Sequence, residues 1–282
     1  MKFFITGATG NVGRAIIANA KNSSLQIVAG LRNPSNIASN TFFDSVLTTP
    51  FDFANLAESS IPADTDIVFL MRPPQITDPK VFRRFLEKCK PSSPHIIFLS
   101  IQGAETKEYT PHRKIEHKII ESGLAYTFIR PSYFMDNLIT ILYAEIKNNR
   151  RIYMPSGHMK LNWLDVDDIG ALIVKVAKER ELYRNRSLEI TGLETIDFHQ
   201  VVEIINRNTP RAIRYENPNL FRYILHSLRE DKSWTLMAVM LLLHWLPKFG
   251  KAPVSTNTFA EIMGREPRRL DEFIDQHRQH FA

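Results

Sequence analysis

The chain has 282 residues, of which 44% are hydrophobic and 23% charged, and its formal net charge is +6. This length can bury a full core, and the composition is typical of soluble globular proteins. The single cysteine, Cys89, excludes an intrachain disulfide framework and a cysteine-built metal site, so no metal is expected. Lysine and arginine are scattered along the chain, so no nucleic-acid partner is expected either.

The chain opens with a short apolar run that leads into closely spaced glycines. Residues 2–5 are predicted to form a strand, Gly7, Gly10 and Gly13 a turn, and residues 14–20 the start of a helix. In this context the first glycine allows a tight turn, the second lets the backbone approach a pyrophosphate, and the third lets the helix pack closely on the strand. The helix N-terminus then faces the phosphates, so the sequence predicts a dinucleotide site.

Strand and helix patterns alternate over the first half of the chain. Strands are expected at residues 25–31, 45–48, 66–71, 95–100 and 125–130, and helices at 79–89, after Asp78, and at 112–122, before Gly123. The continuous apolar strands are typical of a sheet covered on both faces. The pattern predicts an α/β fold with a doubly wound parallel sheet of the Rossmann type, over residues 1–150.

The second half mixes short strands with helices. Strands are expected at 151–154, 187–191 and 212–215, and helices at 167–178, 197–206, through most of 218–245, and at 269–280. We interpret residues 151–282 as a smaller α+β lobe, interleaved with the first domain, that caps the carboxyl edge of the sheet and sets the substrate. The apolar run 236–246 is about half the length that spans a bilayer, so it predicts a buried helix or the wall of an apolar pocket.

Nothing at the N-terminus predicts a signal peptide, because a nucleotide-binding strand occupies it. A cytoplasmic protein without a membrane partner is expected, and its oligomeric state stays open.

The end of the second strand bears on the choice of cofactor. Arg32 stands where an acidic residue would accept hydrogen bonds from the ribose of NAD, and no Asp or Glu lies between Lys21 and Asp44. An arginine pairs instead with the 2′-phosphate of NADP. NADP(H) is therefore expected, with NAD(H) as the other possibility, unless Arg32 is only a surface residue.

Two further strand ends carry candidate cofactor contacts. Asp52 and Phe53 suit the adenine edge, although Asp52 is equally suited to cap a helix that starts near Ala54. Met71 and Arg72 end the next strand, where the backbone would face the nicotinamide ribose. Arg72 is either a ligand contact or a solvated loop residue.

Several segments together resemble the NmrA-like family, a branch of the short-chain dehydrogenase/reductase superfamily. They are residues 6–13, 32–34, 98–100, 112–116, 122–124, 129–137, 165–170, 258–260 and 264–268. The run Arg130-Pro131-Ser132-Tyr133-Phe134-Met135-Asp136-Asn137 is the more specific sign of this branch.

The resemblance implies a Rossmann-type NAD(P)-binding domain with a small C-terminal lobe, and either NADPH-dependent reduction of quinones and dyes or NADP(H) sensing with protein binding. By position, the pyrophosphate would be held by Gly7, Thr9, Gly10, Asn11, Val12 and Gly13, and the 2′-phosphate by Arg32. Pro131, Tyr133 and Asn137 would lie near the nicotinamide and the mouth of the substrate site.

The catalytic pair of the superfamily, Tyr-x-x-x-Lys, is incomplete. Lys114 stands at the lysine position, but the residue four places earlier is Thr110, and Tyr109 is one place off. The literal match at Tyr143 and Lys147 follows the wrong strand. Epimerase or dehydratase chemistry on a sugar nucleotide, which needs this acid and base, is therefore disfavoured.

Other side chains near this position have open roles. Lys114 is either a cofactor ligand or an exposed helix residue, and His112 is either a proton donor or a capping residue. The hydroxyl of Ser100, at the end of a central strand, either faces the nicotinamide or satisfies the backbone.

Hydride transfer remains possible without the tyrosine, because a quinone-like acceptor forms a stabilised anion that water can protonate. The sequence therefore favours an NADPH-dependent oxidoreductase acting on a conjugated small-molecule acceptor, with Phe134, Met135 and residues 234–245 as candidate pocket walls. The alternative is a non-catalytic NADP(H)-binding redox sensor with a regulatory protein partner.

Overall fold

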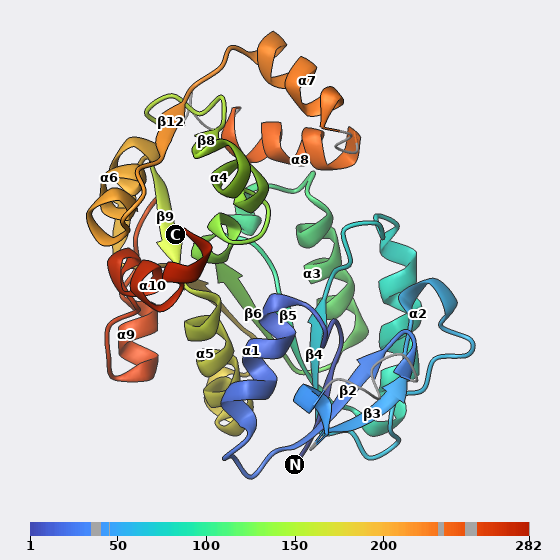
Figure 1. Cartoon of the computed structure of the whole chain (residues 1–282). Coiled ribbons are helices and arrows are strands. Elements are labelled where there is room, and N and C mark those ends of the chain that lie inside the picture. Colours follow the sequence, from blue (N-terminus) through green and yellow to red (C-terminus); the bar gives the residue numbers. More distant parts are fainter. Residues whose placement is uncertain (35–40, 45, 231–233, 246–252, 282) are drawn as a thin grey trace. The chain divides into compact units, whose positions relative to one another are not determined.

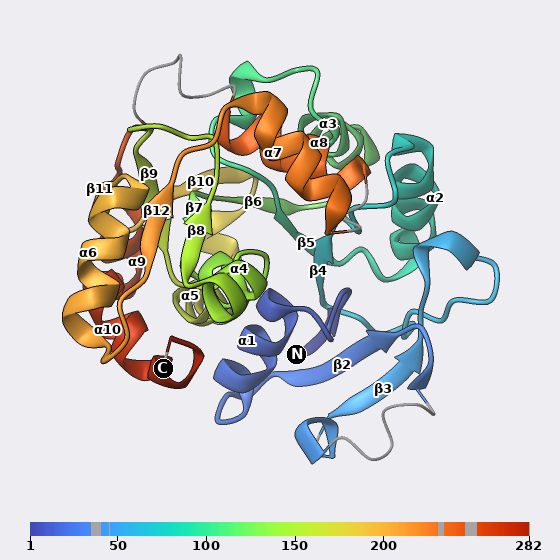
Figure 2. The same cartoon turned by 45° about the horizontal axis from the view of Figure 1, so that its top comes forward.

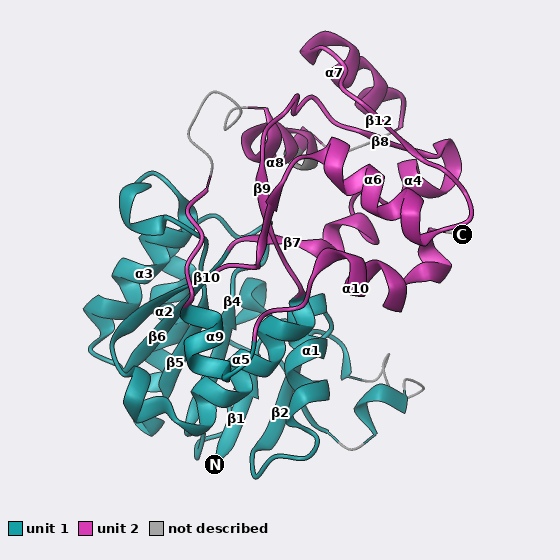
Figure 3. Cartoon of the chain, turned by 90° about the vertical axis from the view of Figure 1, so that its left-hand side faces the viewer, with its two compact units in different colours: residues 1–131, 166–190, 258–265 teal, residues 132–165, 191–257, 266–282 magenta. Residues whose placement is uncertain are grey.

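The computed structural model describes residues 1–34, 41–44, 46–230, 234–245 and 253–281 (Figure 1). The chain divides into two compact units, each made of several segments (Figure 3). Unit 1 comprises residues 1–131, 166–190 and 258–265, and unit 2 comprises residues 132–165, 191–257 and 266–282. The boundary near residue 150 between the Rossmann domain and the smaller, interleaved lobe stays a prediction.

Unit 1 is built on a seven-stranded parallel sheet, as the alternation of strand and helix patterns predicted. Its order is β10-β6-β5-β4-β1-β2-β3. The strands are β1 (Lys2–Ile5), β2 (Gln26–Leu31), β3 (Leu47–Pro50), β4 (Ile67–Met71), β5 (His95–Leu99), β6 (Tyr126–Pro131) and β10 (Arg186–Ile190). Residues 3–5, 67–70 and 95–99 are buried without interruption, since helices cover both faces of these central strands.

The helices of unit 1 are α1 (Asn11–Ala20), α2 (Pro79–Cys89), α3 (Pro111–Ser122), α5 (Val166–Lys178) and α9 (Thr258–Met263). Figure 2 shows α1 and α5 on one side of the sheet and α2 and α3 on the other. Asp78 caps α2 with its side chain, and Gly123, at φ +76°, ends α3. Helices α1 and α5 approach so closely that a Cβ at Gly170 would lie 2.6 Å from the carbonyl carbon of Ala15.

The placement of one strand in the smaller lobe is wrong. The segment around residues 187–191 forms β10, which pairs in parallel with β6 and becomes an edge of the main sheet. The sequence pattern of a short strand does not say which sheet it joins, because that depends on where the preceding helix, α5, packs. The third strand begins at Leu47, and Ser45 lies outside the described residues.

Unit 2 has two small sheets surrounded by helices. Strands β11 (Glu194–Ile196), β9 (Leu161–Leu164) and β7 (Tyr133–Phe134) form one, and β8 (Arg151–Tyr153) and β12 (Arg214–Glu216) the other. The helices are α4 (Tyr143–Asn149), α6 (Phe198–Asn208), α7 (Leu220–Arg229), α8 (Trp234–His244) and α10 (Leu270–Gln276). Both units also contain 3₁₀ turns, at Thr41–Phe43, Phe53–Asn55, Lys90–Ser92, Ala104–Thr106, Met135–Leu138, Arg180–Tyr183 and Arg278–His280.

The core of unit 2 surrounds Trp163, which is fully buried. Beside it, the buried Asn162 accepts hydrogen bonds from the Gly192 amide at 2.7 Å and from the Ser132 hydroxyl at 2.8 Å. Its amide nitrogen donates to the Gly192 carbonyl at 2.9 Å and to Thr195 at 3.0 Å. This one side chain thus ties three separate segments of unit 2 together, with its polar atoms satisfied as burial requires.

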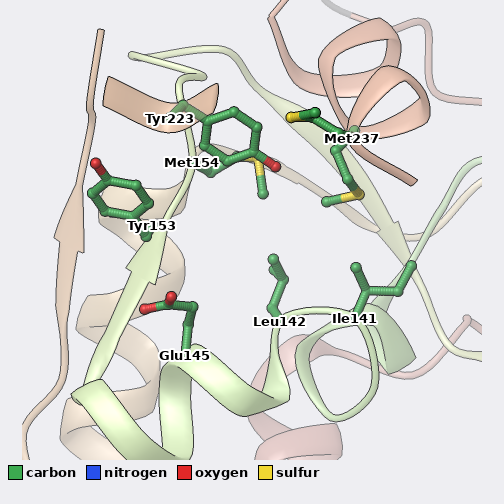
Figure 4. A pocket seen from close by; sticks show the side chains of 8 residues that line it. Ile141, Leu142, Glu145, Tyr153, Met154, Tyr223 and Met237 are labelled. Carbon is green, nitrogen blue, oxygen red and sulfur yellow. The ribbon is translucent and has the colours of Figure 1, made fainter. Parts of the chain in front are cut away.

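Helix α8 is only half buried, although its sequence is apolar throughout. Met237, Met240 and His244 are buried, whereas Val239, Leu242 and Leu243 are exposed. Met237 and Met240 line a cavity of about 20 Å³, together with residues of α4, α7 and β8 (Figure 4). The expectation of a buried helix is therefore wrong for these exposed residues, and a substrate pocket at this helix stays a prediction. Within the described ranges, no helix is both long enough and apolar enough to cross a bilayer.

Two buried histidines make the stability depend on pH. Burial lowers the pKa of His95 from 6.5 to about 4 and that of His244 to about 3. Below about pH 6.5 these histidines therefore bind protons in the unfolded chain but stay neutral in the folded chain. The free energy of unfolding must then fall as the pH falls towards 4. We expect a loss on the order of a few kcal/mol, measured by urea unfolding at a series of pH values.

The matched variants are His95→Gln, which should make this pH dependence shallower, and His199→Gln, which changes an exposed histidine and should leave it unchanged. Identical pH dependence in His95→Gln and the unmodified protein would contradict the explanation.

Candidate functional site

The glycine loop lies between β1 and α1, with the geometry that a phosphate loop requires. Gly7 adopts φ +64°, a backbone conformation that residues other than glycine rarely adopt. Its carbonyl accepts a hydrogen bond from the Gly10 amide at 3.0 Å. A Cβ at Gly13 would lie 2.3 Å from the Gly7 carbonyl oxygen and 2.7 Å from the Ala8 Cα. Only glycine at 13 lets the helix approach the loop this closely.

The N-terminus of α1 is open to a ligand. Its N-cap residue, Gly10, has no side chain to accept from the helix amides, and the first turn contains no acidic residue. By contrast, α2 and α3 have their first amides capped by Asp78 and Thr110. Thr9 and Asn11 beside Gly10 are exposed. An uncapped positive helix end next to exposed backbone is suited to an anion.

Two residues that the sequence analysis did not assign hold this loop in place. The buried Thr6 hydroxyl donates to the Phe69 carbonyl at 2.9 Å and accepts from the Met71 amide at 3.0 Å, which joins the end of β1 to β4. Arg14 donates from Nε to the Thr9 carbonyl at 3.1 Å. A hydroxyl directly between a buried strand and the first glycine was the available sequence signal for Thr6.

Arg32 directly follows β2, the strand next to β1 in the sheet. Its side chain is exposed, and it has no ion pair or hydrogen bond with any residue that the structure describes. No acidic residue stands at this strand end. The guanidinium is therefore available for a phosphate, as the NADP(H) expectation requires.

The side chains at the next two strand ends are largely engaged by the protein. Asp52 accepts from the Ala54 amide at 2.9 Å and caps the turn Phe53–Asn55, which was one of its two expected roles. The ring of Phe53 is buried against Phe51 and Phe85, with centroids 4.9 and 5.2 Å away. The Met71 side chain lies against the glycine loop, because a Cβ at Gly7 would lie 2.3 Å from its methyl carbon. Contact of Asp52 or Phe53 with adenine stays a prediction.

Arg72 is not a solvated loop residue. Its Nη1 donates to the carbonyls of Pro73, Pro74 and Ile76 at 3.1 to 3.2 Å, and burial lowers its pKa. Its Nε is buried with no hydrogen-bond partner among the described residues. Burial, followed by the charge of Arg72, lowers the pKa of His112 to about 4. His112 is therefore neutral near pH 7, and a proton-donating role would have to use the neutral ring.

The hydroxyl of Ser100, directly after β5, is not bonded to the backbone of any described residue, and its contact with the nicotinamide stays a prediction. It donates to Oε1 of Glu116 on α3 at 2.6 Å. The same carboxylate accepts from Arg130 at 3.0 and 2.9 Å and from Arg113 at 3.0 Å. Burial opposes ionisation of Glu116, but the hydrogen bonds from Arg130 and Ser100 hold its pKa below the usual range. Since an ionised carboxylate only accepts, the Ser100 proton is committed to Glu116.

This buried ion network is the largest feature of unit 1 that the sequence analysis missed. Arg130, at the end of β6, also pairs with Glu105 and, at 3.5 Å, with Glu189 on β10. The network thus joins α3, β6 and β10 close to the carboxyl edge of the sheet. The available signal was helical spacing, which puts Glu116 on the same buried face of α3 as Ile115 and Ile119.

Lys114 is exposed and has no ion pair or hydrogen bond with any described residue, so both of its expected roles stay open. Pro131 is buried at the end of β6, and its carbonyl accepts from the Gln102 amide at 3.1 Å. Among the described residues, no group of three or more His, Cys, Asp or Glu side chains is placed to hold a metal ion.

The remaining expected site residues belong to unit 2. Tyr133 and Phe134 form β7, and Asn137 lies in the turn Met135–Leu138. The Tyr133 hydroxyl lies 3.3 Å from Nε2 of His244, and its ring packs edge-on against Trp163. Burial raises the pKa of Tyr133, although a hydrogen bond with Asn137 opposes the shift. Met135 is fully buried in the core of unit 2, which is the commoner role of such a residue.

Comparison with known proteins adds to this geometry. Residues 100–274 match the model of the NmrA-like family, and residues 7–180 match that of an NAD(P)H-binding family. The chain belongs to the NmrA-like family. The resemblance on the glycine loop and on residues 129–137 is thereby confirmed, as is the Rossmann-type fold.

Two curated relatives of this NmrA-like protein are distant. It is 26% identical over 98% of its length to the prestalk A differentiation protein A of Dictyostelium discoideum, of which the match covers 92%. It is 27% identical over 59% of its length to an NAD(P)H azoreductase of Xenophilus azovorans, of which the match covers 58%.

Solved structures with the same fold include reductases and a regulator. The triphenylmethane reductase of Citrobacter sp., complexed with NADP(H), superposes with a TM-score of 0.82 at 16% identity, covering 98% of this chain and 99% of that one. The NADPH-dependent quinone oxidoreductase of Escherichia coli gives 0.80 at 17% identity, covering 98% and 99%. The negative transcriptional regulator NmrA, in complex with NADP, gives 0.71 at 16% identity, covering 98% and 94%. At these identities the likeness shows the fold alone.

The buried network predicts a strong effect at Glu116. Glu116→Ala should lower the free energy of unfolding by about 3–5 kcal/mol, because Arg130 would keep a buried charge without its main partner. Glu108→Ala is the matched control, since Glu108 also pairs with Arg113 but is largely exposed, and it should cost far less stability. Equal losses in urea unfolding would contradict the structural role of the buried carboxylate.

Proposed function

We propose that this protein is an NADPH-dependent reductase of a flat, apolar, conjugated acceptor such as a quinone or a dye. Two observations carry the proposal. The N-terminus of α1 is open where Gly13 lies close to Gly7, and the exposed guanidinium of Arg32, at the neighbouring strand end, has no partner among the described residues. This arrangement fits an NADP phosphate group better than an NAD ribose. The reductase names of several relatives and neighbours support the activity.

The chain's own residues would contribute mainly binding and orientation. The glycine loop amides, with Thr9 and Asn11, would hold the pyrophosphate, and Arg32 the 2′-phosphate. NADPH supplies the hydride. Thr110, at the position of the superfamily tyrosine, is engaged in capping α3, where it accepts from the Arg113 amide at 3.3 Å and donates to the Lys107 carbonyl at 2.8 Å. A conjugated acceptor fits such a site, because its reduced anion is stable enough to be protonated by water.

A second candidate is a redox sensor that binds NADP(H) without turnover and acts through a protein partner. The hydrogen bonds of Thr110 and Ser100 within the protein favour it, since Thr110 stands at the position of the superfamily tyrosine and caps α3, and the Ser100 proton is committed to Glu116. The fold shared with a regulator that binds NADP is consistent with this role. A sensor must bind NADPH and NADP+ with different affinities, whereas similar affinities would leave it unable to report the redox ratio.

The cofactor choice predicts the effect of Arg32→Glu. Calorimetric titration of the cofactor-stripped protein should show NADPH bound more tightly than NADH, and Arg32→Glu should weaken NADPH by about tenfold or more while changing NADH little. Arg84→Glu, which changes an exposed arginine on α2, is the control for net charge. Equal loss for both cofactors would show that Arg32 does not read the 2′-phosphate.

Turnover separates the two candidate functions. A reductase should oxidise NADPH with quinones and with cationic triarylmethane dyes. The dyes need only a hydride and no proton, so the lack of a protein acid should not slow them. We expect measurable dye reduction whose rate changes little between pH 6 and 8, since the pKa of His112, about 4, lies outside that range. Tight NADPH binding without oxidation across both acceptor classes would leave the sensor as the function.

A further inference from the structure

Helices α7 and α8 present an exposed apolar face that no described residue of unit 2 covers. On α7, Phe221, Leu225 and Leu228 recur at the spacing of one helical stripe and are all exposed, Phe221 by 75%. On α8, Val239, Leu242 and Leu243 are exposed, and Trp234 at its start is 69% exposed. We call these seven side chains the α7–α8 apolar face.

The apolar face is the outer side of a pair of helices whose inner sides share one cavity. Tyr223 of α7 and Met237 and Met240 of α8 line that cavity, and Figure 4 shows Tyr223 and Met237 beside it. The exposed residues therefore belong to the sides of α7 and α8 that point away from it. Soluble monomers rarely expose so many large apolar side chains together unless the surface has an occupant.

The charges on α7 indicate which occupant fits. Arg222 and Arg229 are exposed, and each lies about a quarter turn around the helix from Phe221, at the border of the stripe. Neither has a carboxylate partner among the residues that the structure describes. Glu230, the exposed acidic residue after α7, lies on the side opposite the stripe. Positive charge therefore borders the apolar face, and negative charge points away from it.

We propose that the α7–α8 apolar face is a docking surface for an anionic lipid bilayer. An apolar stripe bordered by arginines is the pattern of helices that lie in the plane of a membrane interface. The stripe would enter the acyl boundary while the long arginine side chains reach the lipid phosphates. An exposed tryptophan is suited to the same depth, because its ring is apolar and its N–H is polar. This surface replaces the expectation that no membrane takes part, and it does not depend on the proposed function.

The test is flotation of the full chain with phosphatidylcholine vesicles, with and without phosphatidylserine. The protein should float with the anionic vesicles, bind the neutral ones more weakly, and be released by added salt. The tryptophan fluorescence should shift to the blue on binding, and Trp234→Phe should reduce that shift, because the buried Trp163 keeps its emission.

Surface variants then locate the contact. Phe221→Ser should lower vesicle binding by about tenfold or more, and Arg222→Gln and Arg229→Gln by about fivefold each. Leu182→Ser and Arg207→Gln are the controls, because Leu182 is 64% exposed in unit 1 and Arg207 is exposed on α6, and neither belongs to the apolar face. Thermal unfolding of each variant shows that it is folded.

Three results would overturn the proposal. The first is that the protein binds neither kind of vesicle. The second is that Phe221→Ser binds vesicles as well as the unmodified protein does. The third is a stable dimer in sedimentation equilibrium that Phe221→Ser dissociates. The last result would assign the face to a second copy of this chain.

Discussion

The close approach of α1 to the end of β1 is the constraint on which the rest of unit 1 depends. At Gly13 the helix lies so near the Gly7 carbonyl that no side chain fits between them, and Thr6 fixes the same turn to β4 from the other side. This approach leaves the first amides of α1 uncapped, beside exposed backbone. A parallel sheet gathers the carboxyl ends of its strands at one edge, so the loop, Arg32 and the residues after β4 and β5 come together without long connections.

The Glu116–Arg130 network at the same edge of the sheet has a structural role, because it holds α3, β6 and β10 together. Charged groups are costly to bury, and this carboxylate remains ionised only because three donors surround it. The network lies just after β5 and at the end of β6, and it commits the Ser100 hydroxyl to a carboxylate. Together with the capping role of Thr110, this leaves the edge better suited to binding and orienting a cofactor than to transferring protons.

Unit 2 differs from unit 1 in how it distributes its apolar residues. Its core is organised around Trp163 and the hydrogen-bonded Asn162, and one side of α7 and α8 encloses a cavity. The opposite sides of these two helices keep their apolar residues in contact with solvent. Removing apolar surface of this kind from water is favourable, so a binding partner on this side of the helices would stabilise them.

The sequence by itself determined the features that depend on neighbouring residues. The glycine turn, the caps at Asp78 and Gly123, the order of strands and helices, and the arginine that ends the second strand are all local, so they could be predicted, and so could the family and the class of cofactor. Tertiary structure decided what depends on distant partners. It placed β10 at the edge of the main sheet, joined Ser100 to Glu116 and Arg130, and buried only one side of α8. Residue patterns specify which side chains are apolar or charged, but only the packing of segments far apart in the chain decides which of them meet.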